Sequence, residues 1–187
     1  MAKILVVYAT DYGNTKTVAE AVAEGARSVP GTEVTVKEAE TVTGDDLTAA
    51  DGIVFGSPTH MGSADWRIKK LIDTVCAPLW MKDALVGKVG AVFATGGGYG
   101  HAGGGNEVTM LGMLNNFAEL GLVLLPLPRN TPGYGEAGLQ WGPYVRTHAA
   151  DGSPAGSRPE QLVSAQHHGA NVARAATALR GTAIFPA

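Results

Sequence analysis

The sequence has little cysteine, with only Cys76 among its 187 residues. A single cysteine excludes an internal disulfide framework, and without a C-x-x-C pair the chain lacks a thiol redox motif, so we expect a reducing, cytoplasmic compartment. The chain also lacks a large excess of either charge, because it has 14 basic and 17 acidic residues. This near balance predicts no nucleic-acid partner and no binding to anionic lipid.

Long hydrophobic runs are also lacking. Lys3 precedes an apolar run that Asp11 soon interrupts, and no later run approaches the roughly 20 apolar residues that span a bilayer. We therefore expect neither export nor membrane insertion, and small molecules as partners. A hydrophobic content of 45% suits one globular domain, expected over residues 1–187, with a sizeable core.

Short apolar runs alternate with segments of helical periodicity along the chain. The expected strands are residues 3–9, 33–37, 52–56, 88–94 and 122–127, and the expected helices lie around residues 18–29, 43–50, 66–75, 108–118 and 162–179. Nearly continuous apolar strands with helices between them predict a parallel sheet covered on both faces, which is a doubly wound α/β sandwich. Pro126 and Pro128 place the last strand at an edge, where a missing N–H costs little.

In such a sheet, ligands bind at the carboxyl ends of the strands, where the strand order reverses. The first loop there reads TDYGNT, from Thr10 to Thr15. A helix that begins near Asn14 offers unpaired N–H groups, and the neighbouring hydroxyls add donors, so the loop predicts a phosphate nest. It is not a nucleoside triphosphate loop, because no G-x-x-x-x-G-K-[ST] motif occurs. For the loop alone, an ordinary side-chain N-cap is an equal alternative.

Two further loops at this edge are unusual. The second, GSPTHMGSADW, has short side chains that keep its backbone close to the crevice, where amides and carbonyls can read the edge of a flat polar ring. The third, residues 95–107, has seven glycines in thirteen residues, and either admits a ligand to its backbone or is a flexible connector. It contains Gly98-x-Gly100-x-x-Gly103, but the acidic residue that a dinucleotide fingerprint requires about 20 positions later falls near Glu119, inside an expected helix.

Together the three loops resemble the flavodoxin-like superfamily and, within it, the NAD(P)H:quinone oxidoreductases of the WrbA type. The resemblance covers Lys3 to about Arg180, and its motifs are Tyr12-Gly13, S-P-T before Gly62, Leu79-Trp80, VFAT before a glycine run ending in GGGNE, and Gly142-Pro143-Tyr144 before DGS at 151–153. It implies a flavodoxin-like three-layer sandwich with a five-stranded parallel sheet of order 2-1-3-4-5, and FMN as the cofactor.

The resemblance also assigns each loop a part of FMN. The implied residues are Thr10, Tyr12, Gly13, Asn14 and Thr15 for the phosphate, Pro58, Thr59, His60, Met61 and Gly62 for the isoalloxazine ring, and Thr95, Gly96, Gly97 and Gly98 for its pyrimidine side.

The activity implied by the resemblance is two-electron transfer from NAD(P)H to a quinone or another small acceptor. His60 stands where the family has arginine, and His60 and His101 are candidates to stabilise negative charge on the reduced ring. Trp80 is expected to form part of the pocket over a neighbouring chain's flavin in a homo-oligomer, a dimer or tetramer. These three are the expected catalytic residues; the alternatives are solvated loop histidines and a tryptophan that caps its own core.

A flavodoxin-type single-electron carrier that docks to protein partners is the alternative function. Such a carrier is expected to have dense surface acid and aromatic residues over the flavin, and neither is evident in the sequence. A module that binds another phosphate ligand is a third alternative. No metal site is expected, since His167 and His168 are adjacent on the last helix and therefore lie on different faces.

Overall fold

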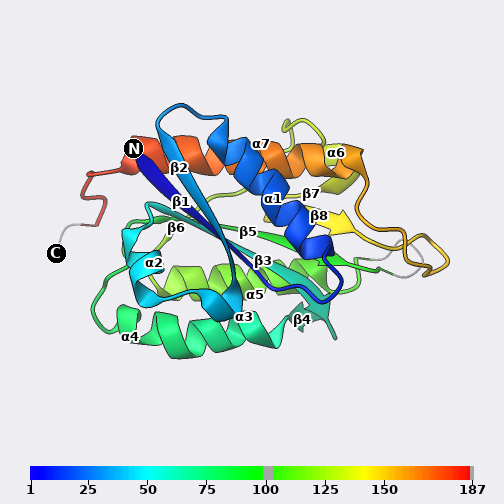
Figure 1. Cartoon of the computed structure of the whole chain (residues 1–187), viewed down its shortest axis with the longest axis horizontal. Coiled ribbons are helices and arrows are strands. Elements are labelled where there is room, and N and C mark those ends of the chain that lie inside the picture. Colours follow the sequence, from blue (N-terminus) through cyan, green and yellow to red (C-terminus); the bar gives the residue numbers. More distant parts are fainter. Residues whose placement is uncertain (99–102, 186–187) are drawn as a thin grey trace.

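A mostly parallel sheet forms the middle layer of the computed structural model, which describes residues 1–98 and 103–185 (Figure 1). Its long strands are β1 (Ala2–Tyr8), β2 (Thr32–Glu38), β3 (Gly52–His60) and β5 (Val89–Gly96). They lie in the order β2-β1-β3-β5, and each neighbouring pair is parallel. The flavodoxin-like α/β sandwich predicted from the sequence is therefore confirmed.

The position of the fifth strand is filled by two segments rather than by the single run expected at 122–127. β6 (Val123–Leu124) pairs with the beginning of β5, and β8 (Gly142–Arg146) pairs with its end. Between them the chain passes through α6 (Tyr134–Ala137) and β7 (Gly138–Leu139), and β7 pairs with β8 in the antiparallel direction at the edge of the sheet. Pro126 has no N–H with which to continue the ladder, so a later segment completes the edge.

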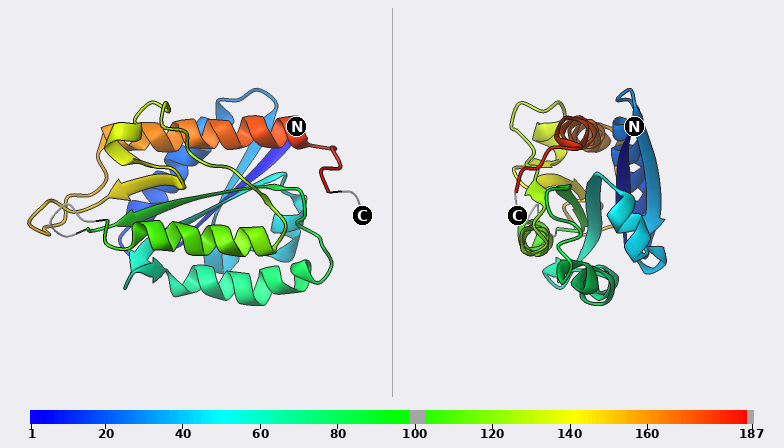
Figure 2. Two further views of the ribbon diagram at one scale, coloured as in Figure 1. Left: turned by 180° about the vertical axis from the view of Figure 1, so that it is seen from behind. Right: turned by 90° about the vertical axis from the view of Figure 1, so that its left-hand side faces the viewer.

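Helices cover both faces of the sheet (Figure 2). α1 (Asn14–Arg27) and α7 (Pro159–Leu179) lie side by side on one face. The other face carries α5 (Asn106–Glu119) and a continuous run of α3 (Trp66–Leu71), the π-helical turn η2 (Ile72–Cys76) and α4 (Ala77–Trp80). The short 3₁₀ turn η1 (Ala39–Thr41) and α2 (Gly44–Ala49) connect β2 to β3. Within the described ranges, no helix combines the length and apolar character that a membrane span requires.

Alternate residues of each strand enter two separate apolar layers. Val6, Val54 and Ala91 belong to the layer beneath α1 and α7, whereas Leu5 and Ile53 belong to the layer beneath α3 and α5. Because both faces of the strands are buried, the sequence shows continuous apolar runs rather than alternation.

The two helices on the first face approach each other closely. A Cβ atom on Gly169 of α7 would lie 1.9 Å from the carbonyl oxygen of Val22 in α1, so only glycine permits this backbone contact. The neighbouring His168 is completely buried. Burial lowers the pKa of its imidazole to about 4, although the backbone of Val92 offsets part of the effect.

The buried histidine predicts a loss of stability in mild acid. In the unfolded chain the pKa of His168 returns to about 6.5, so between pH 6.5 and pH 4 the unfolded state binds more protons and is favoured as the pH falls. We expect this residue to remove about 3 kcal/mol from the free energy of unfolding across that range. Urea unfolding as a function of pH should show a smaller loss for His168→Gln than for the parent.

The matched control is His167→Gln, one position earlier on the same helix and partly exposed. It should keep the parent's pH dependence. Equal losses in the parent and in H168Q would show that other groups cause the acid sensitivity.

Candidate functional site

The loop between β1 and α1 forms the first part of the site. α1 follows Gly13, whose φ of +84° is a left-handed conformation that glycine adopts without strain. Thr10 Oγ1 accepts a hydrogen bond from the backbone N–H of Gly13 at 3.0 Å, which closes the loop. No side chain of the described residues caps this helix, so the alternative of an ordinary side-chain N-cap is wrong. The N–H groups of the first turn are instead directed out of the helix, where they suit an anion.

Thr15 and Thr95 connect this first loop to the end of β5. Both side chains are buried, and their hydroxyl oxygens lie 2.8 Å apart. One hydroxyl hydrogen makes this bond, so the hydrogen of the other hydroxyl is left to donate elsewhere. The first loop therefore combines helix N–H groups with a hydroxyl donor at the carboxyl edge of the sheet.

The second loop is a tight hairpin that the sequence did not predict. β3 continues to His60, turns at Met61 and Gly62, and returns as β4 (Ser63–Ala64). The φ angles of Met61 and Gly62 are +49° and +77°, as in a type I′ turn. The Met61 side chain is fully exposed, although its backbone conformation is one that favours glycine or asparagine.

The hairpin and the glycine-rich third loop are fixed against each other. Thr59 Oγ1 donates to Oδ1 of the buried Asn106 at 2.6 Å, and the Asn106 amide also donates to the Gly103 carbonyl. A Cβ atom on Gly105 would lie 2.6 Å from the Cα atom of Gly62, so the two loops touch through bare backbone. The third loop is thus packed at its C-terminal end and is not simply a connector there.

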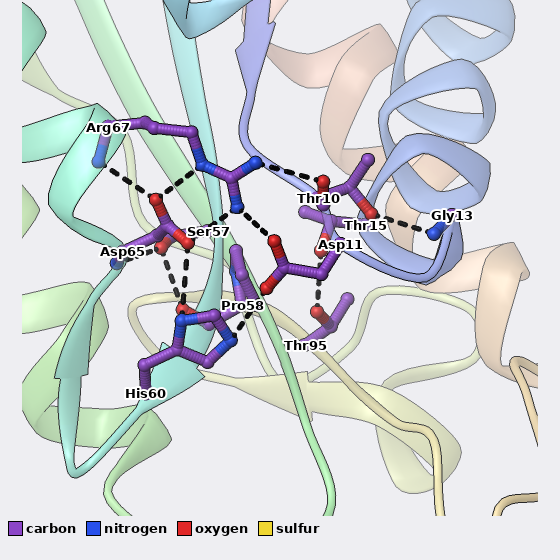
Figure 3. A network of polar contacts seen from close by, with 10 residues as sticks. All are labelled: Thr10, Asp11, Gly13, Thr15, Ser57, Pro58, His60, Asp65, Arg67 and Thr95. Atoms are coloured by element: carbon purple, nitrogen blue, oxygen red, sulfur yellow. Dashed lines mark hydrogen bonds and ion pairs between the residues drawn. The ribbon is translucent and has the colours of Figure 1, made fainter.

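A charged cluster of Asp11, His60, Asp65 and Arg67 joins the first loop to the second (Figure 3). The carboxylate of Asp65 is completely buried and accepts from Nε and Nη2 of Arg67 at 2.8 Å. The same guanidinium reaches the first loop, where Nη1 donates to the Thr10 carbonyl at 3.1 Å and Nη2 donates to Asp11 at 2.6 Å. The two ring nitrogens of His60 lie 3.3 Å from Asp11 and 3.2 Å from Asp65.

Electrostatics within this charged cluster favour the ionised Asp65. Burial by itself would raise the pKa of the carboxyl, but the hydrogen bonds from Arg67 outweigh it and hold the pKa below its usual range. The hydrogen bond to Asp65 in turn raises the pKa of Arg67. Asp11, His60 and Asp65 bring ligand atoms within 4.8 Å of one another, as a metal site would, but a cation there would compete with Arg67 for both carboxylates.

The remaining expected residues are not all at this edge. Tyr12 lies in the first loop and is 90% exposed. Trp80 is half exposed and ends the helical run that begins beside the hairpin, so one chain does not bring Trp80 and His60 together (Figure 1). His101 lies outside the described residues.

Sequence reasoning missed Asp11, Asp65, Arg67 and Asn106 as parts of the site. One signal was present for Asp65, because Asp just before an expected helix is a preferred N-cap residue. In the structure its carboxylate accepts a hydrogen bond from the backbone N–H of Arg67. The contacts of Arg67 with the first loop have no local signal.

The buried ion pair predicts a large cost for neutralising Asp65. Asp65→Asn should lower the free energy of unfolding by about 3–5 kcal/mol, because it leaves the largely buried guanidinium without its main counter-charge. Urea denaturation measures this loss.

Asp73→Asn is the control, since Asp73 pairs with Lys69 four residues earlier on the same helical run and both side chains are exposed. It should cost no more than about 0.5 kcal/mol. Equal costs for the two variants would mean that the Asp65 pair has no special place in the fold.

Comparison with known proteins identifies the family of the chain. A family model described as "Flavodoxin domain" matches residues 5–99. A flavodoxin from Aquifex aeolicus is 47% identical over 123 residues, and the match spans 64% of this chain and 64% of the length of that relative.

Solved structures agree in fold. A crystal structure of a flavodoxin, WrbA-like protein from Agrobacterium tumefaciens is similar with a TM-score of 0.70 and 26% identity, over 96% of this chain and all of that chain. Oxidised flavodoxin 1 from Bacillus cereus has a TM-score of 0.66 and 18% identity over 92% and 98% of the two chains, which shows the fold alone.

The expectation of an NAD(P)H:quinone oxidoreductase is wrong. The relative with 47% identity is named a flavodoxin, a small electron-transfer protein rather than a nicotinamide–quinone dehydrogenase. The motifs that suggested the enzyme lie mostly in the loops at the carboxyl edge, and loops that cradle a cofactor do not specify where its electrons come from.

Proposed function

Because the chain belongs to the flavodoxin family, we propose that it is a single-electron carrier that binds one FMN and docks to protein redox partners. FMN is the cofactor of this family, and when bound it supplies reversible storage of electrons in its ring. The similarity to a flavodoxin supports the carrier function, and one observation of the structure supports the FMN site. Three loops that follow three parallel strands meet at one edge, joined by the Thr15–Thr95 and Thr59–Asn106 hydrogen bonds.

The donors of the first loop fit the phosphate of FMN. The first-turn N–H groups of α1 supply neutral donors with the positive end of the helix dipole, and the Thr15–Thr95 pair supplies a hydroxyl hydrogen. We assign the phosphate to residues 10 and 12–15, the ring to 58–62, and its pyrimidine side to 95–98. Met61 and Tyr12 present exposed side chains beside these loops, and the ring would give them an apolar surface to cover.

A WrbA-like relationship in sequence and fold, without the quinone reductase activity, is the finer part of the proposal. It is supported by the 26% identity to the WrbA-like flavodoxin over nearly the whole chain. The homo-oligomer, for which the exposed Trp80 and Met81 offer apolar contact surface, stays a prediction.

The phosphate assignment predicts a specific effect of the Thr15 hydroxyl. Thr15→Val keeps the shape of the side chain but removes a hydrogen bond to a charged group, which contributes about 1.5–3 kcal/mol. The Kd for FMN should therefore rise roughly ten- to a hundred-fold. Quenching of FMN fluorescence by the apoprotein measures it.

Thr177→Val is the control, because the Thr177 hydroxyl donates to the Ala173 carbonyl within α7, far from the loops. It should leave the Kd unchanged. FMN binding by T15V as tight as that of the parent would disprove the phosphate assignment.

The carrier function predicts how the loaded protein responds to nicotinamides. A carrier that receives electrons from a protein partner has no need of a nicotinamide pocket, so NADH or NADPH alone should leave the flavin absorbance unchanged in the absence of oxygen. Dithionite should bleach it fully, which shows that the flavin is reducible. Rapid bleaching by either nicotinamide would overturn the carrier proposal.

A further inference from the structure

Asp11 raises a question of charge, because it is a carboxylate in the loop to which we assign a phosphate. An anion beside another anion weakens binding unless a cation neutralises it. Both oxygens of Asp11 are engaged, one by Nη2 of Arg67 at 2.6 Å and the other near Nε2 of His60 at 3.3 Å. Figure 3 shows the Asp11 carboxylate directed toward Arg67 and His60 and away from Gly13 and Thr15.

We propose that Asp11 and Arg67 form a tether that holds the phosphate loop in its binding conformation before FMN arrives. In this proposal, which rests on the function proposed above, both are positioning residues rather than phosphate ligands. The tether fixes the loop at two points, the carbonyl of Thr10 and the side chain of Asp11.

The fixed end of the tether lies in the core. Asp65 holds the guanidinium at 2.8 Å, and the backbone N–H of Asp65 donates to Ser57 Oγ on β3 at 2.8 Å. Both Asp65 and Ser57 are completely buried. Asp65 and Ser57 therefore fix the Arg67 guanidinium relative to the sheet, and Arg67 in turn fixes the position of the first loop.

The other end of the tether, at Thr10 and Asp11, positions the start of α1. The carbonyl of Thr10 accepts from Arg67, and the hydroxyl of the same residue accepts from the N–H of Gly13, the residue that precedes the helix. Holding Thr10 thus holds the turn that directs the helix N–H groups. A loop that is already ordered loses less conformational entropy when its ligand binds, so the tether raises affinity without touching the ligand.

Arginine is required for this geometry. Its planar fork donates from Nε, Nη1 and Nη2 to acceptors on two separate segments, and the single ammonium of lysine cannot span them.

The tether and a simple charge effect predict opposite changes in FMN affinity when Asp11 is neutralised. Asp11→Asn removes a negative charge, so a purely electrostatic role would tighten FMN binding. A tether predicts the opposite, a several-fold loss in FMN affinity, because the Asn amide keeps one acceptor for Arg67 but loses the charge-assisted bond that holds the loop. Riboflavin has no phosphate, so its Kd should change less than two-fold. Fluorescence titration of the apoprotein with each ligand gives both values.

Two further variants complete the experiment. Arg67→Lys keeps a cation beside Asp65 and should also weaken FMN but not riboflavin. Asp73→Asn alters the net charge by the same amount as D11N on an exposed pair and should alter neither Kd. Urea denaturation of each variant confirms that it is folded at the temperature of the titration.

The outcomes separate the tether from the function on which it rests. FMN binding by D11N that equals or exceeds that of the parent overturns the tether and leaves the carrier proposal standing. Equal losses for FMN and riboflavin also overturn it, since they indicate general damage to the site. A parent protein that binds neither ligand overturns the proposed function and the tether together.

Discussion

Parallel pairing of β1, β3 and β5 is the constraint on which the site depends. Parallel strands end at the same edge of the sheet, so the segments that follow Tyr8, His60 and Gly96 meet although they are far apart in the sequence. Each segment contributes something that the others lack: helix N–H donors from the first, a hairpin tip from the second and bare backbone from the third. Hydroxyl and amide side chains then hold the three segments together, and the buried ones, Thr15, Thr95 and Asn106, require partners because their polar atoms are away from water.

The buried charge of Asp65 links the stability of the core to the geometry of this edge. The negative charge of a carboxylate that is shielded from water needs a counter-charge. Arg67, two residues later in α3, supplies it. The same guanidinium has donors left over, and they point toward the first loop. A requirement of folding therefore places a cation against Thr10 and Asp11, and the loop is ordered by a residue whose first role lies elsewhere.

The sequence predicted the features that depend on local pattern and missed those that depend on tertiary pairing. Apolar runs and helical periodicity gave the strands and helices, and the polar stretch after β1 gave the first loop. Nothing local announces that Arg67 returns to Asp11, 56 positions earlier. The β3–β4 hairpin was missed because Met61 occupies a positive-φ position where glycine or asparagine is the usual signal. The division of the fifth strand was missed because β8 lies far from β5 in the sequence and no local pattern indicates that the two strands pair.

His60 shows why the function could not be read from the cofactor loops alone. In the sequence it stands as an isolated histidine, free to oppose negative charge on a reduced ring. In the structure its two ring nitrogens face Asp11 and Asp65, so both are engaged within the charged cluster rather than offered to a ligand. Residues of the cofactor loops thus serve to hold one another, and that work is the same in a carrier and in a reductase. What separates the two functions is the surface left open beside these loops, where the exposed side chains include those of Tyr12 and Met61.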